Sequence, residues 1–499
     1  MVLNERSGAG DAAARRAVVD IGSNSVRLVV YNGPQHAPFP ICNEKALCGL
    51  GRDMGDDGTL NPAAVEDALA TLKRFRRLLD EFGDPPVRAI ATAAVREARD
   101  GKEFVGRANA IGFDVRIISG QEEAMLTAMG VASFEPGATG LVGDMGGGSL
   151  ELVALKKGAV SKGGSYPLGP FHLMRAVGGE IDKAAALAEK AAGDIDWLEP
   201  GKFKTLYSVG GAWRALARIH MRVKDHPLSV LHHYELPGAE AIEVCDLVAR
   251  QSRRSLAEIP GISRRRLDTL PYAAVVLKAV IRRAGVKRLL VSAGGVREGL
   301  LYQELSNADR ARDPLLEACR FYAERLAPEP DFGPAAMAAI DPLFADDSRK
   351  ERRLREAICL LVDIGAYFHP DLRALHAFDT ALRAPFAGIS HRERVIAGLS
   401  LYRRHEGRSA PKPREPAVDL LSEEDQRRAT TLGLALRFAA AFSPKAAAPL
   451  RGVRLSLEDG KLVFSAPAAR KELMGEFPRK RFVSLAAAFD AEPVERYED

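Results

Sequence analysis

The sequence has few cysteines and no long apolar run. Its five cysteines are scattered over 499 residues and form no C-x-x-C pair, which excludes a disulfide framework or a structural zinc site and is typical of a reducing compartment. No apolar run approaches the roughly 20 residues that a membrane span needs. Residues 1–16 lack the apolar core of a signal peptide. We therefore expect a cytoplasmic protein with no membrane partner and with residues 1–16 as a flexible tail.

The overall composition is that of an ordinary globular protein. Hydrophobic residues make up 46% of the chain and charged residues 27%, with a net charge of +5. A chain of this length is too long for a single hydrophobic core, so two to four domains are expected. Such a mild positive charge does not by itself indicate an anionic partner, and we expect no specific nucleic-acid partner.

Two glycine-rich loops carry most of the information. The sequences are Val18-Val19-Asp20-Ile21-Gly22-Ser23-Asn24-Ser25 and Leu141-Val142-Gly143-Asp144-Met145-Gly146-Gly147-Gly148-Ser149. Each follows a short apolar run with an aspartate near its end and leads into a second apolar run, which predicts two β-hairpins. Glycines let successive backbone N–H groups approach an anion, and each aspartate could hold Mg²⁺. Two such loops facing each other would bind a chain of phosphates.

The first three hundred residues alternate between predicted strands and helices. Strands are expected at 88–92, 115–119, 206–209 and 289–292, and a helix at about 122–132. Gly210-Gly211 and Gly294-Gly295 each follow a strand and open a further helix, to 219 and 304 respectively. This repetition predicts two related α/β lobes with a cleft between them.

A different pattern begins near Asn307 to Pro314. Apolar spacing of i, i+3, i+4 predicts helices at 315–326, 352–364, 392–403 and 423–442. Residues 452–464 alternate around Asp459-Gly460 and predict a hairpin. We expect domains at 17–135, 136–308, 309–415 and 416–499: two α/β lobes, a helical domain and a small α+β domain.

Basic residues are concentrated in the C-terminal half. Eight basic and two acidic residues lie between Arg383 and Arg414, and a second cluster contains Arg253-Arg254 and Arg264-Arg265-Arg266. A long polyanion would bind such surfaces, although charge runs are as often only solvated faces.

Several side chains are candidates for chemistry. Glu122 and Glu123 begin a predicted helix, where an acidic first turn is common but where a general base for phosphoryl transfer would also be well placed. Arg96 follows a strand and could bind phosphate through its fork of N–H groups, or be an exposed helix residue. Arg27 alternates with apolar neighbours and is expected to face the cleft. Glu151 could join Asp144 on a metal or point outward from its strand.

Together these segments resemble the exopolyphosphatase / guanosine pentaphosphate phosphohydrolase (Ppx/GppA) family. The resemblance rests on residues 19–28, 91–98, 118–124, 144–151, 208–211 and 292–299 and spans about 300 residues. It implies an α/β fold of two ribonuclease-H-like lobes of the actin-like superfamily, followed by a helical HD-like region with a small α+β end. It also implies a homodimer.

The resemblance assigns roles residue by residue. Glu123 matches the catalytic base, beside Glu122, and Arg96 matches a phosphate-contacting position. Asp20, Asp144 and Glu151 match acidic positions at the Mg²⁺ site. The matches to phosphate-binding positions are Ser23, Asn24, Ser25, Arg27, Gly146, Gly147, Gly148, Ser149, Gly210 and Gly211. The implied reaction is hydrolysis of a terminal phosphoanhydride by water that Glu123 deprotonates.

One departure concerns the helical region. Family members often carry a His-Asp pair there, whereas this chain has Val362-Asp363. A second metal centre is therefore not expected, and we expect a structural and substrate-guiding domain that uses the basic residues between Arg383 and Arg414.

The sequence leaves four functions to compare. An exopolyphosphatase acting on inorganic polyphosphate is favoured, and a phosphohydrolase converting pppGpp to ppGpp in the stringent response is the alternative. A kinase or ATPase of the same fold is disfavoured because Glu122-Glu123 occupies the hydrolase base position. An inactive polyanion-binding regulator is disfavoured because Glu123, Asp144 and Glu151 are all present. A dinucleotide-binding enzyme is unexpected, since no G-x-G-x-x-G opens a helix.

Overall fold

The computed structural model describes residues 15–52, 54, 57–260, 262, 264–409 and 411–498. The described chain forms two compact units, one ending at Arg312 and the other beginning at Asp313. Each unit is described by itself below. The predicted tail at 1–16 lies outside the described residues except for Arg15 and Arg16, and Arg16 begins the first strand.

The first unit begins with a five-stranded mixed sheet in the order β3-β2-β1-β4-β5. Strands β1, β2 and β3 are antiparallel neighbours, and β4 and β5 continue the sheet in parallel. The elements are β1 (Arg16–Ile21), β2 (Val26–Asn32), β3 (Phe39–Ala46), α1 (Pro62–Glu81), β4 (Val87–Ala91), α2 (Ala93–Glu97), α3 (Gly101–Asn109), β5 (Val115–Ile117) and α4 (Gly120–Phe134).

A second, six-stranded sheet follows, in the order β10-β11-β9-β6-β7-β8. Its elements are β6 (Gly140–Met145), β7 (Leu150–Lys156), β8 (Ala159–Tyr166), α5 (Pro170–Ala176), α6 (Ile181–Gly193), β9 (Thr205–Val209), α7 (Gly211–Val223), β10 (Glu235–Pro237), α8 (Gly238–Arg250), α9 (Arg253–Ala257), α10 (Leu270–Ala284), β11 (Arg288–Val291), α11 (Val296–Gln303) and α12 (Asn307–Arg310). Trp213 and the helices α6, α7, α8 and α10 build a large apolar core on this sheet.

The two sheets repeat one topology. From its β8 edge the second sheet runs β8-β7-β6-β9-β11, which matches β3-β2-β1-β4-β5 strand for strand, with β10 added at the edge. In both, an antiparallel hairpin and a third strand precede two parallel strands. This is the predicted pair of ribonuclease-H-like lobes, and the two predicted hairpins are confirmed.

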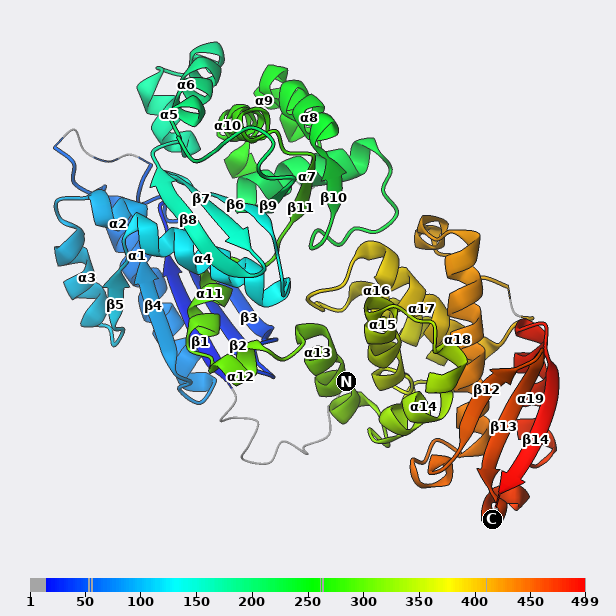
Figure 1. Cartoon of the computed structure of the whole chain (residues 1–499). Helices are drawn as coiled ribbons and strands as arrows, with labels where there is room; N and C mark the ends of the chain where they lie inside the picture. The colour runs from blue at the N-terminus through cyan, green and yellow to red at the C-terminus, as the bar shows by residue number, and fades with distance from the viewer. Residues whose placement is uncertain are drawn as a thin grey trace. The chain divides into compact units, whose positions relative to one another are not determined.

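Helices α4 and α11 lie between the two sheets (Figure 1). Ala124, Ala128 and Val131 of α4 pack on the second sheet, whereas Leu300 and Leu301 of α11 pack on the first. The helices touch backbone to backbone: a Cβ added to Gly130 would overlap the carbonyl oxygen of Gly295. The two halves of the first unit therefore share one tightly packed helix crossing.

The second unit is mostly helical, as predicted, and ends in a three-stranded sheet that contains the predicted hairpin and one further strand. Helix α18 packs on α17, because a Cβ on Gly433 would meet the carbonyl oxygen of Ser400 at 2.5 Å. Its elements are α13 (Pro314–Leu326), α14 (Phe332–Ile340), α15 (Arg349–Leu360), α16 (Arg373–Arg383), α17 (His391–Glu406), α18 (Glu423–Phe442), β12 (Arg454–Glu458), β13 (Lys461–Pro467), α19 (Glu476–Ala488) and β14 (Glu492–Glu498).

Phenylalanines join the helices of the second unit to its sheet. Phe438 and Phe442 of α18 contact Phe464 of β13 at ring-centroid distances of 5.5 and 5.1 Å. Because α17 and α18 lie on opposite sides of residue 415 and pack together, residues 313–498 share one compact body; the predicted boundary at 415/416 stays a prediction. None of the described helices is long and apolar enough to cross a membrane.

Candidate active site

The first glycine-rich hairpin forms a tight turn between β1 and β2. Gly22 N–H donates to the Ser25 carbonyl oxygen at 3.0 Å and closes the turn. The carbonyl oxygens of Ser23 and Asn24 accept hydrogen bonds from Gly51 and Gly49 at 2.7 and 3.2 Å. The loop is therefore held from behind by the segment that follows β3, which fixes its backbone before any ligand binds.

The second glycine-rich hairpin joins β6 to β7 in the same way. Gly146 N–H donates to the Ser149 carbonyl oxygen at 3.0 Å, and the carbonyl oxygens of Gly147 and Gly148 accept from Phe171 and Gly169. The start of α5 therefore holds this loop through its carbonyl groups, as the segment after β3 holds the first loop.

The two loops lie against each other. A Cβ added to Gly148 would be 3.7 Å from the hydroxyl oxygen of Ser23 and 3.7 Å from the Cβ of Ala93, and one added to Gly147 would be 3.4 Å from the Ser23 Cβ. Larger side chains at these glycines would fill the space between the loops. The prediction that the two loops face each other is confirmed.

Two carboxylates lie side by side at the base of the second hairpin. Asp144 of β6 and Glu151 of β7 are cross-strand partners, so their side chains share one face of the sheet. Glu151 is 2% exposed and accepts a hydrogen bond from the Ser165 hydroxyl at 2.8 Å. Thr127 donates to Asp144 at 3.2 Å.

Burial dominates the titration of this pair. It raises the pKa of Asp144 above its ordinary value, although Arg214 opposes the shift. Burial and the charges of Glu123 and Asp144 raise the pKa of Glu151 well above its ordinary value. Three carboxyl groups thus share a site in which full ionisation is unfavourable without a nearby cation.

Glu123 occupies the first turn of α4, which Ser119 caps through its hydroxyl group. Its carboxylate accepts a hydrogen bond from Arg96 Nη1 at 3.1 Å. Burial raises the pKa of Glu123 to about 7, while Arg96 lowers it and the charges of Asp144 and Asp20 raise it further. A carboxylate with a pKa near neutrality can both hold and release a proton at physiological pH, as a general base must.

Glu122 has a different environment from Glu123. Its carboxylate forms an ion pair with Arg116 of β5 at a partly exposed position. The structure therefore gives Glu122 a surface partner and does not bring it to Asp144 and Glu151. Its predicted catalytic role stays a prediction that this geometry does not favour.

A row of charged residues crosses the first sheet beside the carboxylates. Asp20 is the cross-strand partner of Arg27, which is the partner of Lys45. Burial raises the pKa of Asp20, with Arg297 and Arg27 opposing the shift. Arg27 Nε donates to the Asn43 side chain at 2.8 Å. The expected orientation of Arg27 toward the cleft is consistent with its half-buried position beside Asp20.

Three cationic residues at this site were not predicted: Lys45, Arg214 and Arg297. Burial lowers the pKa of Lys45 to about 8, with Arg266, Arg27 and Arg297 contributing further. Arg214 donates to the Gly210 carbonyl oxygen at 3.2 Å. Among the described residues, Arg297 Nε has no hydrogen-bond partner although it is buried.

The sequence held weak signals for these residues. Arg297 lies within the motif at 292–299, and Arg214 follows Gly210-Gly211 by one helical turn. Buried cations without full pairing are typical of sites that receive an anion. We expect these side chains to bind substrate oxygens.

Gly210 and Gly211 lie directly beside Asp144. Gly210 has φ +90°, which favours glycine, and a Cβ there would be 2.8 Å from Asp144 Oδ1. Gly211 accepts a hydrogen bond from Arg266. The structure thus brings the predicted Gly210-Gly211 turn together with the second hairpin.

The donor set is suited to Mg²⁺ only together with substrate. Within the described part of the chain, no group of three acidic, histidine or cysteine side chains is close enough to form a metal cage. Mg²⁺, however, is commonly held by one or two carboxylates and completed by water and phosphate oxygens. Burial raises the pKa values of Asp144 and Glu151 by disfavouring their ionised forms, and a bound cation would offset this cost.

The predicted basic surface between Arg383 and Arg414 is not formed by its central residues. Arg394 is fully buried, and Arg403 and Arg404 are each 6% exposed. The Arg394 guanidinium donates to three backbone carbonyl oxygens, those of Leu382, Ala384 and Phe386. The expectation that this segment guides substrate is wrong for these three arginines, because they are buried and their guanidinium groups bind carbonyl oxygens or Asp363 inside the second unit.

Asp363, at the position of the missing His-Asp pair, also has a structural role. Asp363 is 2% exposed, and its carboxylate pairs with Arg404 at 2.7 Å and with Lys445 at 3.3 Å. Two cations thus surround the carboxylate that a metal would otherwise need. The expectation that the helical region has no second metal centre stays a prediction.

The fold and site define a two-lobed α/β protein with paired glycine-rich loops and, beside them, a group of carboxylates that includes the buried Glu151. The chain belongs to the Ppx/GppA phosphatase family, whose sequence model matches residues 13–308. Members of this family hydrolyse phosphoanhydrides. Residues 335–490 match a second sequence model, that of the C-terminal domain of exopolyphosphatases.

Several known proteins are similar to this chain. Retrograde regulation protein 2 of Saccharomyces cerevisiae is 29% identical over 433 residues, which are 78% of this chain and 72% of that protein. The Ppx/GppA family member of Aquifex aeolicus is 26% identical, with a TM-score of 0.51 over 58% of this chain and 97% of that one. An exopolyphosphatase of Cytophaga hutchinsonii shares the fold at 24% identity and a TM-score of 0.54, over the same fractions.

Proposed function

We propose that this chain is an exopolyphosphatase that removes orthophosphate from the end of inorganic polyphosphate. The observation that carries the proposal is the position of Glu123. It is half-buried beside Arg96, has a pKa of about 7, and shares its site with Asp144 and Glu151 below two facing glycine loops. A hydrolase needs such a base, whereas a kinase excludes water from the same position.

In the proposed reaction, the two glycine loops bind the terminal phosphate through backbone N–H groups. Arg96 donates to phosphate oxygens and also orients the Glu123 carboxylate. Glu123 takes a proton from a water molecule as its oxygen forms a bond to the terminal phosphorus, and the bond from phosphorus to the bridging oxygen breaks. Glu123 then releases this proton to solvent, so that the orthophosphate, the shortened chain and the proton together account for all atoms of water and substrate.

Mg²⁺ would be held by Asp144 and Glu151 and would supply positive charge to the phosphate oxygens. Arg27, Lys45, Arg214 and Arg297 extend the positive charge away from the loops. We propose that they bind the phosphates behind the terminal one, since polyphosphate carries about one negative charge on each unit.

A second candidate is hydrolysis of pppGpp, which offers the same terminal phosphoanhydride. The family includes activities of both kinds. The similarity of residues 335–490 to the C-terminal domain of exopolyphosphatases favours polyphosphate over pppGpp as the substrate.

The test is phosphate release by the purified full-length chain with Mg²⁺, comparing long-chain polyphosphate, pppGpp and ATP at equal terminal-phosphate concentration. A kcat/KM at least ~10-fold higher for polyphosphate than for pppGpp is the expected result. The reverse order would assign the chain to pppGpp hydrolysis. If the wild-type protein releases phosphate from none of the three substrates, both candidate functions are contradicted.

A further inference from the structure

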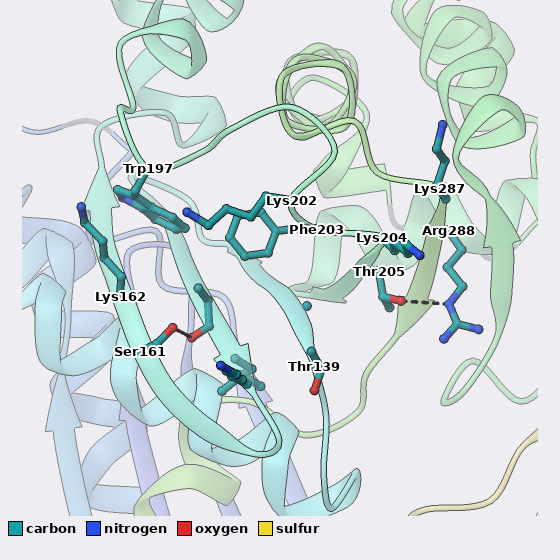
Figure 2. Close-up of a pocket in the computed structure, with 14 residues that line it drawn as sticks. Thr139, Ser161, Lys162, Trp197, Lys202, Phe203, Lys204, Thr205, Lys287 and Arg288 are labelled. Atoms are coloured by element: carbon teal, nitrogen blue, oxygen red, sulfur yellow. Dashed lines mark hydrogen bonds between the residues drawn. The ribbon is translucent and has the colours of Figure 1, made fainter.

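A cavity lies at the opposite end of the second sheet from the glycine loops. It is a cavity of about 700 Å³ lined by the beginnings of β6, β9 and β11 and by the end of β7 and the start of β8 (Figure 2). Strand β6 runs from Gly140, in this cavity, to Met145, beside the loops. Five residue steps of about 3.3 Å separate the two by roughly 17 Å, so the cavity is separate from the candidate active site.

The rim of this cavity carries only positive charge. Six of the lining residues are basic: Lys156, Lys162, Lys202, Lys204, Lys287 and Arg288. None of the described residues that line it carries a carboxylate. A cavity with charges of one sign on its walls attracts ligands of the opposite sign.

Three of these cations lie where two adjacent parallel strands, β9 and β11, begin. The N–H groups of Lys287 and Arg288 both donate to the Lys204 carbonyl oxygen, at 2.9 and 3.1 Å. Figure 2 shows Lys204, Lys287 and Arg288 together on one side of the cavity. Lys287 and Arg288 are consecutive residues, so their side chains leave the backbone on opposite sides. Both nevertheless line the cavity together with Lys204, so the start of these two strands contributes positive charge to it.

Few carboxylates outside the cavity offset this charge. Arg288 pairs with Glu235 at 3.3 Å and Lys202 with Glu199 at 2.7 Å, both at exposed positions where such pairs contribute little. No carboxylate of the described chain lies within ion-pair distance of Lys156, Lys162, Lys204 or Lys287. These four ammonium groups are available to a ligand.

The inner wall is apolar and aromatic. Trp197 and Phe203 contact each other edge to face at 6.1 Å, and Trp197 Nε1 donates to the Tyr166 hydroxyl at 3.0 Å. Both rings are held in place, and Leu155 and Ala154 continue the wall. A bare inorganic anion gains nothing from such a surface, whereas a planar aromatic group does.

We propose that this cavity binds a nucleoside triphosphate, with its base against the wall of Trp197 and Phe203 and its phosphates on the lysine rim. The volume lies within the range of small-molecule sites. The proposal does not depend on the function of the active site, because the two sites share no lining residue.

Tryptophan emission provides the test. The chain has two tryptophans, and Trp213 is 1% exposed in the core with its N–H bound to the Ala273 carbonyl oxygen. Full-length protein is titrated with the non-hydrolysable ATP analogue AMPPNP, with tripolyphosphate and with adenosine. Saturable quenching by AMPPNP with a Kd at or below about 1 mM, absent in Trp197→Phe, is the expected result; calorimetry with the same ligands checks for binding without a change in emission.

The rim is tested by the double variant Lys204→Ala/Lys287→Ala. Its Kd for AMPPNP should rise at least ~10-fold, because two charge-assisted contacts are lost. The matched control, Lys73→Ala/Lys102→Ala, removes two exposed lysines from α1 and α3 and should bind as the wild type does. Phosphate release under saturating polyphosphate should be equal in both variants, which separates this site from the active site.

Three results would overturn the proposal. Equal affinity for tripolyphosphate and AMPPNP would show a simple anion site that makes no use of the aromatic wall. Equal affinity for adenosine and AMPPNP would remove the role of the lysines. Unchanged AMPPNP binding in Lys204→Ala/Lys287→Ala, or no binding by calorimetry, would place the nucleotide elsewhere or exclude it.

Discussion

Arg96 Nη1 donates to both the Glu123 carboxylate, at 3.1 Å, and the Ile118 carbonyl oxygen, at 2.9 Å. One guanidinium group thus joins the strand end before α4 to the carboxylate in the first turn of that helix. The contact fixes the direction of Glu123 and, through its positive charge, limits the rise of its pKa. Both effects can be measured.

Replacement of Glu123 by Gln should lower kcat at least ~100-fold, the range expected for loss of a general base, with little change in KM. Gln keeps the shape of the side chain and its contact with Arg96 but cannot accept the proton. Steady-state phosphate release measures both constants. Glu122→Gln, which removes the exposed partner of Arg116, is the matched control and should keep wild-type kcat; equal activity of both variants would exclude Glu123 from the reaction.

The pH dependence of kcat/KM should have an acidic limb governed by Glu123. Only the ionised carboxylate accepts a proton, so activity should fall as the pH drops below its pKa of about 7. Arg96 lowers that pKa, and therefore Arg96→Gln should move the limb to higher pH in addition to lowering the rate. A profile of Arg96→Gln whose acidic limb stays in the wild-type position would contradict this coupling.

Arg297→Ala should raise KM for polyphosphate about 10-fold, the effect of losing one charge-assisted contact, with a smaller change in kcat. The basis is the buried Nε of Arg297, which has no partner within the described chain, and its position beside Asp20. Arg77→Ala, at an exposed site on α1, provides the control. An unchanged KM in Arg297→Ala would show that this cation only offsets the neighbouring carboxylates.

Gly130→Ala should destabilise the first unit by about 1–3 kcal/mol and lower activity, because the added Cβ would overlap the Gly295 carbonyl oxygen where α4 crosses α11. Gly106→Ala in α3 is the matched control, since its Cβ would meet no atom within 4 Å. That change should stabilise the protein by about 0.5–1 kcal/mol. Urea unfolding measures both, and equal effects would mean that the helix crossing can separate freely.

Asp363→Asn should destabilise the second unit by about 3–5 kcal/mol, because it leaves the buried Arg404 without a counter-charge. Asp346→Asn, at an exposed position in the same unit, should change the free energy of unfolding by no more than about 0.5 kcal/mol. The ratio of KM values for long and short polyphosphate should stay unchanged in Asp363→Asn at temperatures where it is folded. A changed ratio without a loss of stability would return this region to a substrate-guiding role.

Much of the fold could be predicted because its signals are local. Helix α18 occupies the predicted residues 423–442, and both glycine hairpins formed where apolar runs flank Gly and Ser. Strand β14 was missed because its sequence, EPVERYE, is largely charged and does not alternate. It pairs in parallel with β13, a contact between residues about thirty positions apart that no local pattern indicates.

Side-chain burial was the main limit on predicting the site. Arg394 and Arg404 were assigned to a surface because charge usually is exposed, yet backbone carbonyl groups and Asp363 stabilise them inside the second unit. Arg214 and Lys45 were missed because the sequence does not show which residues they lie beside. Lys45 lies on a strand without a motif, and Arg214 follows the Gly210-Gly211 turn without belonging to it; only the folded chain brings them to the aspartates.

The repeated topology of the two sheets allows equivalent residues in the two halves of the first unit to be compared. Asp20 and Asp144 are each the fifth residue of a six-residue strand that leads into a glycine turn. The residue opposite Asp20 is Arg27, whereas the residue opposite Asp144 is Glu151. The pseudo-symmetry of the two halves is therefore broken by charge at one equivalent position, so that one copy of the pattern is suited to an anion and the other to a cation.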